Sequence, residues 1–131
     1  MKDYRITIKS TIDGETNEVI TLGDVVKEYG STSVSYVDDI NNNSTRIVIG
    51  EDIVSIIRGG EMDTIMTFEK GKTTYAAIRT EYGEIPLDLE TTGITSGEWD
   101  GGIDLDLKYT TNLAGESSKF NVYVRAERIE G

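Results

Sequence analysis

Residues 53–92, IVSIIRGGEMDTIMTFEKGKTTYAAIRTEYGEIPLDLETT, decide the fold of this chain. Their apolar runs are short, and the glycine-containing segments GGE, KGK and YGE separate them. Short runs of β-branched and aromatic residues divided by glycine turns are typical of strands joined by tight hairpins. The stretch therefore predicts four consecutive antiparallel strands, which the rest of the chain extends.

The flanking segments alternate apolar and polar residues in the same way. Residues 4–12 place Tyr4, Ile6 and Ile8 on one face, and an Asp-Gly turn follows them. Residues 103–109 and 120–124 alternate likewise near the other end. About eight to ten short strands with no long helical pattern predict an all-β fold over residues 1–131 as one domain. The strand rhythm predicts either a single antiparallel up-and-down barrel or a sandwich.

Four places interrupt the simple alternation. Residues 15–30 carry apolar side chains at helical spacing, yet Gly23 and its β-branched neighbours favour two strand pieces with a bulge or bend at Gly23. Pro86 has no amide hydrogen, which predicts a sheet edge or an irregularity. Residues 93–102 are expected to be the least regular stretch. Residues 53–57 are apolar on both faces, which predicts a strand covered on both sides.

The composition excludes several kinds of chemistry. Lys and Arg number 13 against 24 Asp and Glu, a net charge of −11, which disfavours nucleic acids and anionic membrane surfaces as partners. The chain has neither Cys nor His, so thiolate nucleophiles, His-dependent triads and the commonest zinc ligands are excluded. No cofactor and no metal site is expected, and the composition favours a protein that is not an enzyme. No apolar run reaches the ~20 residues of a membrane span, so a cytoplasmic protein is expected.

Three strings carry a resemblance to a known family. They are IIRGGEMDTIMTFEKG at 56–71, IRTEYGEIPLDLET at 78–91 and KYTTNLAGESSKFNVYV at 108–124. In this order they resemble the YwiB-like family of bacterial proteins, and the likeness runs from residue 4 to 127. The family is a domain of unknown function, and the resemblance implies a calycin-like, that is lipocalin-like, β-barrel.

The resemblance also singles out individual positions. They are Arg58 and Gly60 in the family's R-x-G step, Met66, Phe68, Glu69 and Gly71 in its M-x-F-E-x-G turn, Thr80, Tyr82 and Gly83 in its T-x-Y-G turn, and Asn121 at the start of the last strand. Asp38 departs from the family's pattern, where a Glu is expected. The family brings no established activity, so it implies the fold and leaves the function open.

The candidate ligand contacts are Arg58, Met66, Phe68, Arg79 and Tyr109. An inward stripe of Met66, Phe68, Leu87, Leu105, Leu107, Tyr109 and Phe120 lines a ligand cavity in one interpretation and simply fills the core in the other. A guanidinium at Arg58 suits an anionic head group in a barrel mouth, or it pairs with Glu69 or backbone carbonyls. Arg79 has the same two interpretations.

Two acidic patterns favour plain surface roles. Asp39, Asn41 and Asn43 alternate as in a calcium loop, but the required Gly and bidentate acid are missing, which favours a solvated turn. Asp100, Asp104 and Asp106 could bring carboxylates to one strand face, and an exposed polar face explains them better.

Three functions remain open from the sequence. The first is a non-catalytic barrel that binds a small ligand, partly apolar or anionic. The second is a structural or interaction module, homodimeric or with another partner, that docks through residues 53–57 or through Trp99. The third is a carboxylate-based hydrolase, which needs two acids facing one cleft.

Overall fold

The chain folds into a closed antiparallel barrel. The computed structural model describes residues 3–38, 43–59, 64–113 and 115–129. The strands follow in the order β1 (Tyr4–Ile12), β2 (Glu15–Glu28), β3 (Ser31–Asp38), β4 (Asn43–Ile49), β5 (Ile53–Gly59), β6 (Thr64–Glu69), β7 (Thr73–Thr80), β8 (Gly83–Trp99), β9 (Gly102–Leu113) and β10 (Glu116–Arg128). Each strand pairs with its neighbours in sequence, and β10 pairs with β1 to close the ring. The prediction of an all-β up-and-down barrel is confirmed.

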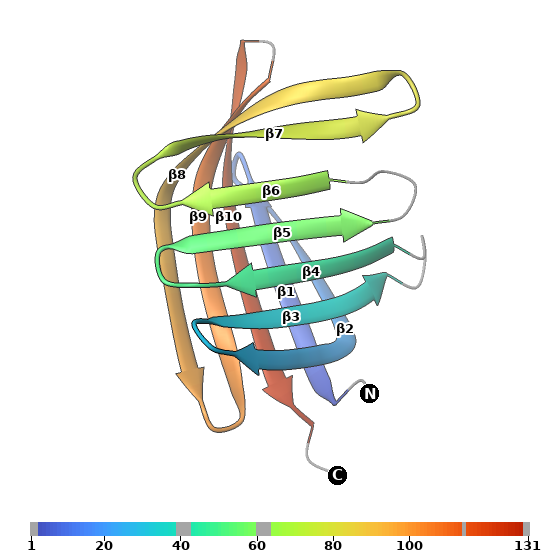
Figure 1. Ribbon diagram of the computed structural model, residues 1–131, viewed down its shortest axis with the longest axis vertical. Helices are drawn as coiled ribbons and strands as arrows, with labels where there is room; N and C mark the ends of the chain where they lie inside the picture. Colours follow the sequence, from blue (N-terminus) through green and yellow to red (C-terminus); the bar gives the residue numbers. More distant parts are fainter. Residues whose placement is uncertain (1–2, 39–42, 60–63, 114, 130–131) are drawn as a thin grey trace.

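Two layers of strands cross each other in this barrel. Figure 1 shows β3, β4, β5 and β6 lying across the long strands β1, β9 and β10. Strands β2 and β8 belong to both layers, because β2 pairs with β1 and then β3, and β8 pairs with β7 and then β9. Crossed layers joined at such corner strands enclose one core between them. The described part of the chain contains no helix that could span a membrane.

Gly23 is the corner of β2. Residues up to Gly23 pair with β1, and residues from Gly23 onward pair with β3. A Cβ at this position would collide with the backbone oxygen of Ser35 and with Cδ1 of Ile6, so glycine is what lets the strands approach here. The predicted bend lies at this exchange of partners. The two separate strand pieces are not observed, since β2 runs unbroken and its pairing shows no register shift.

The structure of β8 corrects the expectation that residues 93–102 are the least regular stretch of the chain. These residues continue β8 to Trp99, and a short turn then leads into β9 at Gly102. The irregularity is a register shift between Thr91 and Gly93, which lets one strand serve both layers. Pro86 pairs with Ala77 of β7, whereas pairing with β9 begins only at Asp88. The prediction of an edge at Pro86 is therefore confirmed.

The core lies between the two layers and consists of the inward side chains of every strand except β2, whose partly buried Val25 packs against it. Its buried apolar members are Ile6, Val34, Ile47, Ile49, Val54, Ile56, Phe68, Ala76, Leu87, Leu89, Ile94, Ile103, Leu105, Leu107, Tyr109, Val124 and Ala126. Burial of such side chains stabilises a fold by roughly 1.5–3 kcal/mol each before the entropy cost of ordering them.

The outer face of β5 is open, which corrects the expectation that it is covered. Val54 and Ile56 point into the core and are buried. Ile53 is 39% exposed, and Ile57 lies on the outer face beside two surface grooves. Since the described strands form a single closed ring, no second layer covers this face of the strand within the described part of the chain.

Candidate ligand-binding site

A pocket of about 440 Å³ opens where β2 and β3 stop pairing. Its lining combines apolar and polar side chains from both layers: Ile8, Ser10, Val19, Ile20, Thr21, Tyr36, Val37, Asn43, Thr45 and Arg58. The volume falls within the range of small-molecule sites in proteins. We call this cavity the mouth pocket.

Strand register places most of these side chains on the inner face. Tyr36 stands opposite Thr45, which in turn stands opposite Arg58, so three neighbouring strands form one wall. Ile8 stands opposite Val19 on the facing wall. Because paired residues in antiparallel strands share a face, each wall presents a continuous row of side chains. The mouth pocket is thus an opening into the barrel, with Ile20 and Val37 at its outer rim.

Two polar groups of the mouth pocket, those of Arg58 and Asn43, lack partners among the described residues. Arg58 is exposed to solvent, and no hydrogen bond or ion pair joins it to another described residue. The side-chain oxygen Oδ1 of Asn43 is buried and has no hydrogen-bond partner in the described part of the chain. A buried acceptor without a donor is costly, and a bound donor relieves it. The mouth pocket therefore presents a cation and an acceptor to a ligand.

Arg58 also acts on the interior of the barrel. Burial raises the pKa of the Tyr109 hydroxyl to about 12, and the positive charge of Arg58 partly opposes this rise. A charge has such an effect only when it lies close to the group or is poorly screened. The guanidinium consequently reaches the electrostatic environment of the core beneath the mouth pocket.

Three predicted site residues belong to the core beside the mouth pocket. Phe68 is completely buried, and its ring centroid lies 4.5 Å from that of Tyr109. Tyr109 in turn stacks on Phe120 at 4.9 Å, with the two rings nearly parallel. Met66 packs against the same core. None of the four residues lines the mouth pocket. The structure thus brings only Arg58 of the predicted contacts to it.

Arg79 lies elsewhere, on the outer surface of the barrel. Its Nη2 atom is 3.3 Å from Oε1 of Glu84, the residue opposite it in β8. Both side chains are largely exposed, so this ion pair contributes little stability. Arg79 lines a surface groove of about 510 Å³ that also contains Ile65, Tyr75 and Arg58, so Arg58 borders both this groove and the mouth pocket.

The alternative pairing of Arg58 with Glu69 is wrong. Glu69 stands opposite Ile53, at the other end of β5, and its Oε2 atom is 3.2 Å from Nζ of Lys72. The separation follows from the antiparallel register of β5 and β6, which brings Thr64 opposite Arg58.

The acidic candidates do not form a site with the mouth pocket. Asp104 and Asp106 lie on the outer face of β9, and Asp104 accepts a 3.3 Å hydrogen bond from the Tyr123 hydroxyl. Asp100 belongs to the turn between β8 and β9. The described residues contain no group of three acids, His or Cys placed to hold a metal ion. Asp39 and Asn41 of the calcium pattern lie outside the described residues.

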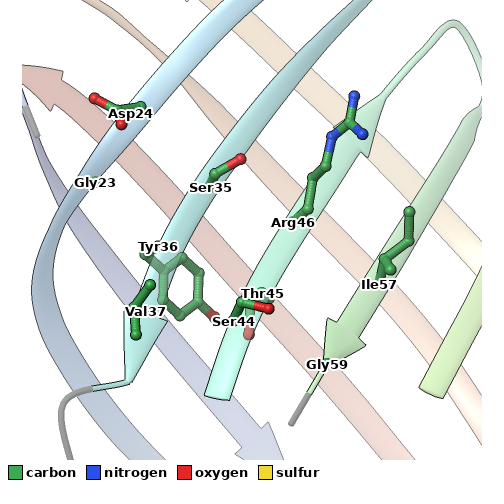
Figure 2. Close-up of a pocket in the computed structure, with 10 residues that line it drawn as sticks. All are labelled: Gly23, Asp24, Ser35, Tyr36, Val37, Ser44, Thr45, Arg46, Ile57 and Gly59. Atoms are coloured by element: carbon green, nitrogen blue, oxygen red, sulfur yellow. The ribbon is translucent and has the colours of Figure 1, made fainter. Parts of the chain in front are cut away.

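A second hollow adjoins the mouth pocket on the outside of the barrel. Figure 2 shows this groove, where Asp24, Ser35, Arg46 and Ile57 come from four neighbouring strands. The same view shows β2 curving away from β3 on one side of Gly23. The groove and the mouth pocket have lining residues in common, namely Tyr36, Val37 and Thr45. The two hollows meet at the end of β3.

The sequence did not single out most of the mouth pocket. Ser10, Thr21, Tyr36 and Thr45 line it from inward positions. The signal that identifies such residues is a polar side chain at a position that the alternation assigns to the inside of the barrel. Tyr36 and Thr45 both satisfy that criterion, because Val34 and Ile47 share their faces.

Comparison with known proteins agrees with this fold. The crystal structure of the ywiB protein from Bacillus subtilis superposes with a TM-score of 0.86, covering 97% of this chain and 92% of that one at 22% sequence identity. No curated protein matches the chain. The family model "Domain of unknown function (DUF1934)" matches residues 4–123. The chain therefore belongs to the DUF1934 family of YwiB-like proteins, whose function is unknown.

Proposed function

We propose that the protein is a non-catalytic binding barrel that holds a small, partly apolar anion in its mouth pocket. The observation that carries the proposal is Arg58, which faces into a pocket without an ion pair to any other described residue. A carboxylate or similar anion would form charge-assisted hydrogen bonds with its guanidinium. Ile8 and Val19 supply apolar contacts on the facing wall.

The mouth pocket offers little to a carboxylate-based hydrolase. Such an enzyme needs two acids that face one cleft, and no Asp or Glu is among the described residues that line this pocket. Asp104 and Asp106 are on the outer wall of a closed barrel. These placements favour binding over hydrolysis.

Sodium hexanoate is a suitable first probe, with hexanol as its uncharged counterpart. We expect hexanoate to shift the amide resonances around Arg58 and Thr45, and hexanol to bind more weakly. Since a hydrogen bond to a charged group contributes roughly 1.5–3 kcal/mol, Arg58→Gln should weaken hexanoate about ten- to hundredfold. Arg79→Gln is the matched control, because it removes an arginine from the outer surface. The proposal is refuted if hexanol binds as tightly as hexanoate, or if Arg58→Gln and Arg79→Gln weaken hexanoate equally.

A second candidate function is protein interaction through the outer face of β5 and β6. Ile57 lines a groove there together with Ile65, which is 62% exposed, and Tyr75. Trp99 is a weaker candidate, because the guanidinium of Arg125 already lies 5.0 Å from its ring centroid. Light scattering tests self-association, and Ile65→Ser should abolish any dimer that this face forms. An unchanged dimer would exclude the face.

A further inference from the structure

Within the described residues, strand β2 has a free edge beside the mouth pocket. Its residues 15–22 pair with β1 on one side, and pairing with β3 begins only at Gly23. No backbone hydrogen bond from outside the strand ladders reaches residues 15–22 from another described residue. An unpaired edge presents alternating N–H and C=O groups that can pair with another extended chain.

The exposed side chains of this edge suit an apolar extended chain. Val19 is 49% exposed and Ile20 is 59% exposed, and both line the mouth pocket. Edge strands are usually protected by proline, lysine or a bulge. Residues 19–22 contain no proline, no lysine and no bulge. Glu18, one residue before them, forms an ion pair with Lys9, in which Oε2 and Nζ are 3.6 Å apart. The unprotected part of the edge is therefore the part that borders the mouth pocket.

Two inward side chains next to this edge, those of Arg58 and Asn43, match the chemistry of a peptide carboxyl terminus. Thr45 stands opposite Arg58, and Asn43 lies two residues before Thr45 on the same face. Such diagonal neighbours are separated by about 7–8 Å. A peptide end presents a carboxylate, which suits the Arg58 guanidinium, and an amide N–H, which suits the buried Oδ1 atom of Asn43.

We propose that the mouth pocket binds the carboxyl terminus of an extended peptide, which pairs as an added strand with the free edge of β2 and places its carboxylate at Arg58. This inference rests on the proposed function, since it names the class of anion that the pocket takes. The net charge of −11 disfavours an acidic peptide and favours a basic one. Apolar side chains in the peptide would contact Val19 and Ile20.

The decisive probe is an acetylated pentapeptide, Lys-Val-Ala-Val-Val, with a free carboxyl terminus. Three ligands serve for comparison: the same peptide with a carboxyl-terminal amide, the same peptide with N-methylated backbone nitrogens, and hexanoate. We expect the free acid to bind at least tenfold more tightly than each of these three. The amide loses the ion pair, the N-methyl version loses strand pairing, and hexanoate lacks a backbone. In Arg58→Gln the acid and the amide should bind equally.

A matched pair of variants and an exchange measurement complete the test. Ile20→Ser should weaken the peptide several-fold, whereas Ile65→Ser, which alters an equally exposed isoleucine on β6, should leave it unchanged. Amides in residues 18–22 should gain protection from hydrogen exchange when the peptide binds.

The possible failures are distinguishable. If hexanoate binds at Arg58 and N-methylation has no effect on the peptide, the peptide inference is overturned and the proposed function stands. If neither hexanoate nor the peptide binds, both are overturned. If the protein is a dimer in which residues 18–22 are already protected, the edge belongs to a second copy and the peptide inference is overturned.

Discussion

Burial raises the pKa of the Tyr109 hydroxyl in β9, and the guanidinium of Arg58 in β5 partly opposes this rise, although the two residues come from opposite layers of the barrel. Arg58 has a solvent-exposed side chain and Tyr109 is 7% exposed. The pair therefore links the mouth pocket to the aromatic cluster of Phe68, Tyr109 and Phe120. Any change of charge at Arg58 should be detected at Tyr109.

Replacing Arg58 by Gln should raise the pKa of Tyr109 further. Burial already raises this pKa to about 12, and the variant removes the charge that opposes the rise. NMR of ¹³C-labelled tyrosine rings at pH 11.5 should show a smaller ionised fraction of Tyr109 in Arg58→Gln than in the parent. Arg79→Gln serves as the control, since Arg79 is paired with Glu84 on the outer surface. An unchanged Tyr109 titration in Arg58→Gln would contradict the proximity of the two groups.

Burial of Tyr109 should make the fold sensitive to alkali. Its pKa is 10.0 when unperturbed and about 12 in the fold, so the folded state holds the proton more tightly. The stabilisation is complete below pH 10 and declines as the pH rises to 12, because the unfolded chain ionises first. A shift of this size corresponds to a loss of about 3 kcal/mol.

Urea unfolding at pH 9 and pH 11.5 measures this loss. Tyr109→Phe should lose distinctly less stability than the parent between the two values, because phenylalanine has no proton to release. Tyr29→Phe, at a fully exposed ring, should behave like the parent. Equal losses in all three proteins would show that Tyr109 does not carry the alkaline sensitivity.

Alternation along the chain was sufficient to predict the strands and their inner face, and the family resemblance favoured a barrel over a sandwich. Met66, Phe68 and Tyr109 were placed on the inside correctly, as was the opposition of Val54 and Ile56 to Ile53 and Ile57. A period of two residues distinguishes the inside from the outside, but it does not tell how far along the barrel a side chain lies. For that reason the pattern alone predicts Phe68 and Tyr109 as ligand contacts, although they lie in the packed core.

Long-range pairing explains what alternation could not predict. The exchange of partners at Gly23 leaves the period unchanged, so neither the corner nor the gap between β2 and β3 is visible in the sequence. Residues 73–80 have small or mixed side chains on both faces, so the pattern did not assign Arg79 to the outside. Arg58 was identified because a guanidinium next to an apolar run is unusual wherever it points.

Gly23→Ala should destabilise the barrel more than Gly93→Ala. The new Cβ at position 23 would meet the backbone oxygen of Ser35 and the buried side chain of Ile6, neither of which can move freely. At position 93 the nearest atom, Cβ of Lys108, is 3.7 Å away, which is an ordinary contact. We expect a cost of about 1–3 kcal/mol for the first variant and little for the second. Thermal unfolding of the two variants side by side measures the difference, and similar melting temperatures would show that β2 turns its corner without needing glycine.

At the other end of the barrel, Thr32 of β3 donates a 2.7 Å hydrogen bond to Oε1 of Glu98 in β8. These strands are not neighbours in the ring, so the bond ties the two layers together. Thr32 is buried, and Thr32→Val keeps its shape while removing the donor, which should cost about 1 kcal/mol. The ion pair of Lys27 with Glu98 is longer, at 3.9 Å, and half exposed, so Lys27→Met should cost less.

A double-mutant cycle with Thr32→Val and Glu98→Ala isolates this bond. Chemical unfolding of the two single variants and the double variant should give a coupling energy of about 1 kcal/mol, because either substitution alone already breaks the contact. The cycle of Lys27→Met with Glu98→Ala should give a smaller value, since solvent screens that pair. Strict additivity in the first cycle would mean that the layers are held together by the apolar core and the corner strands alone.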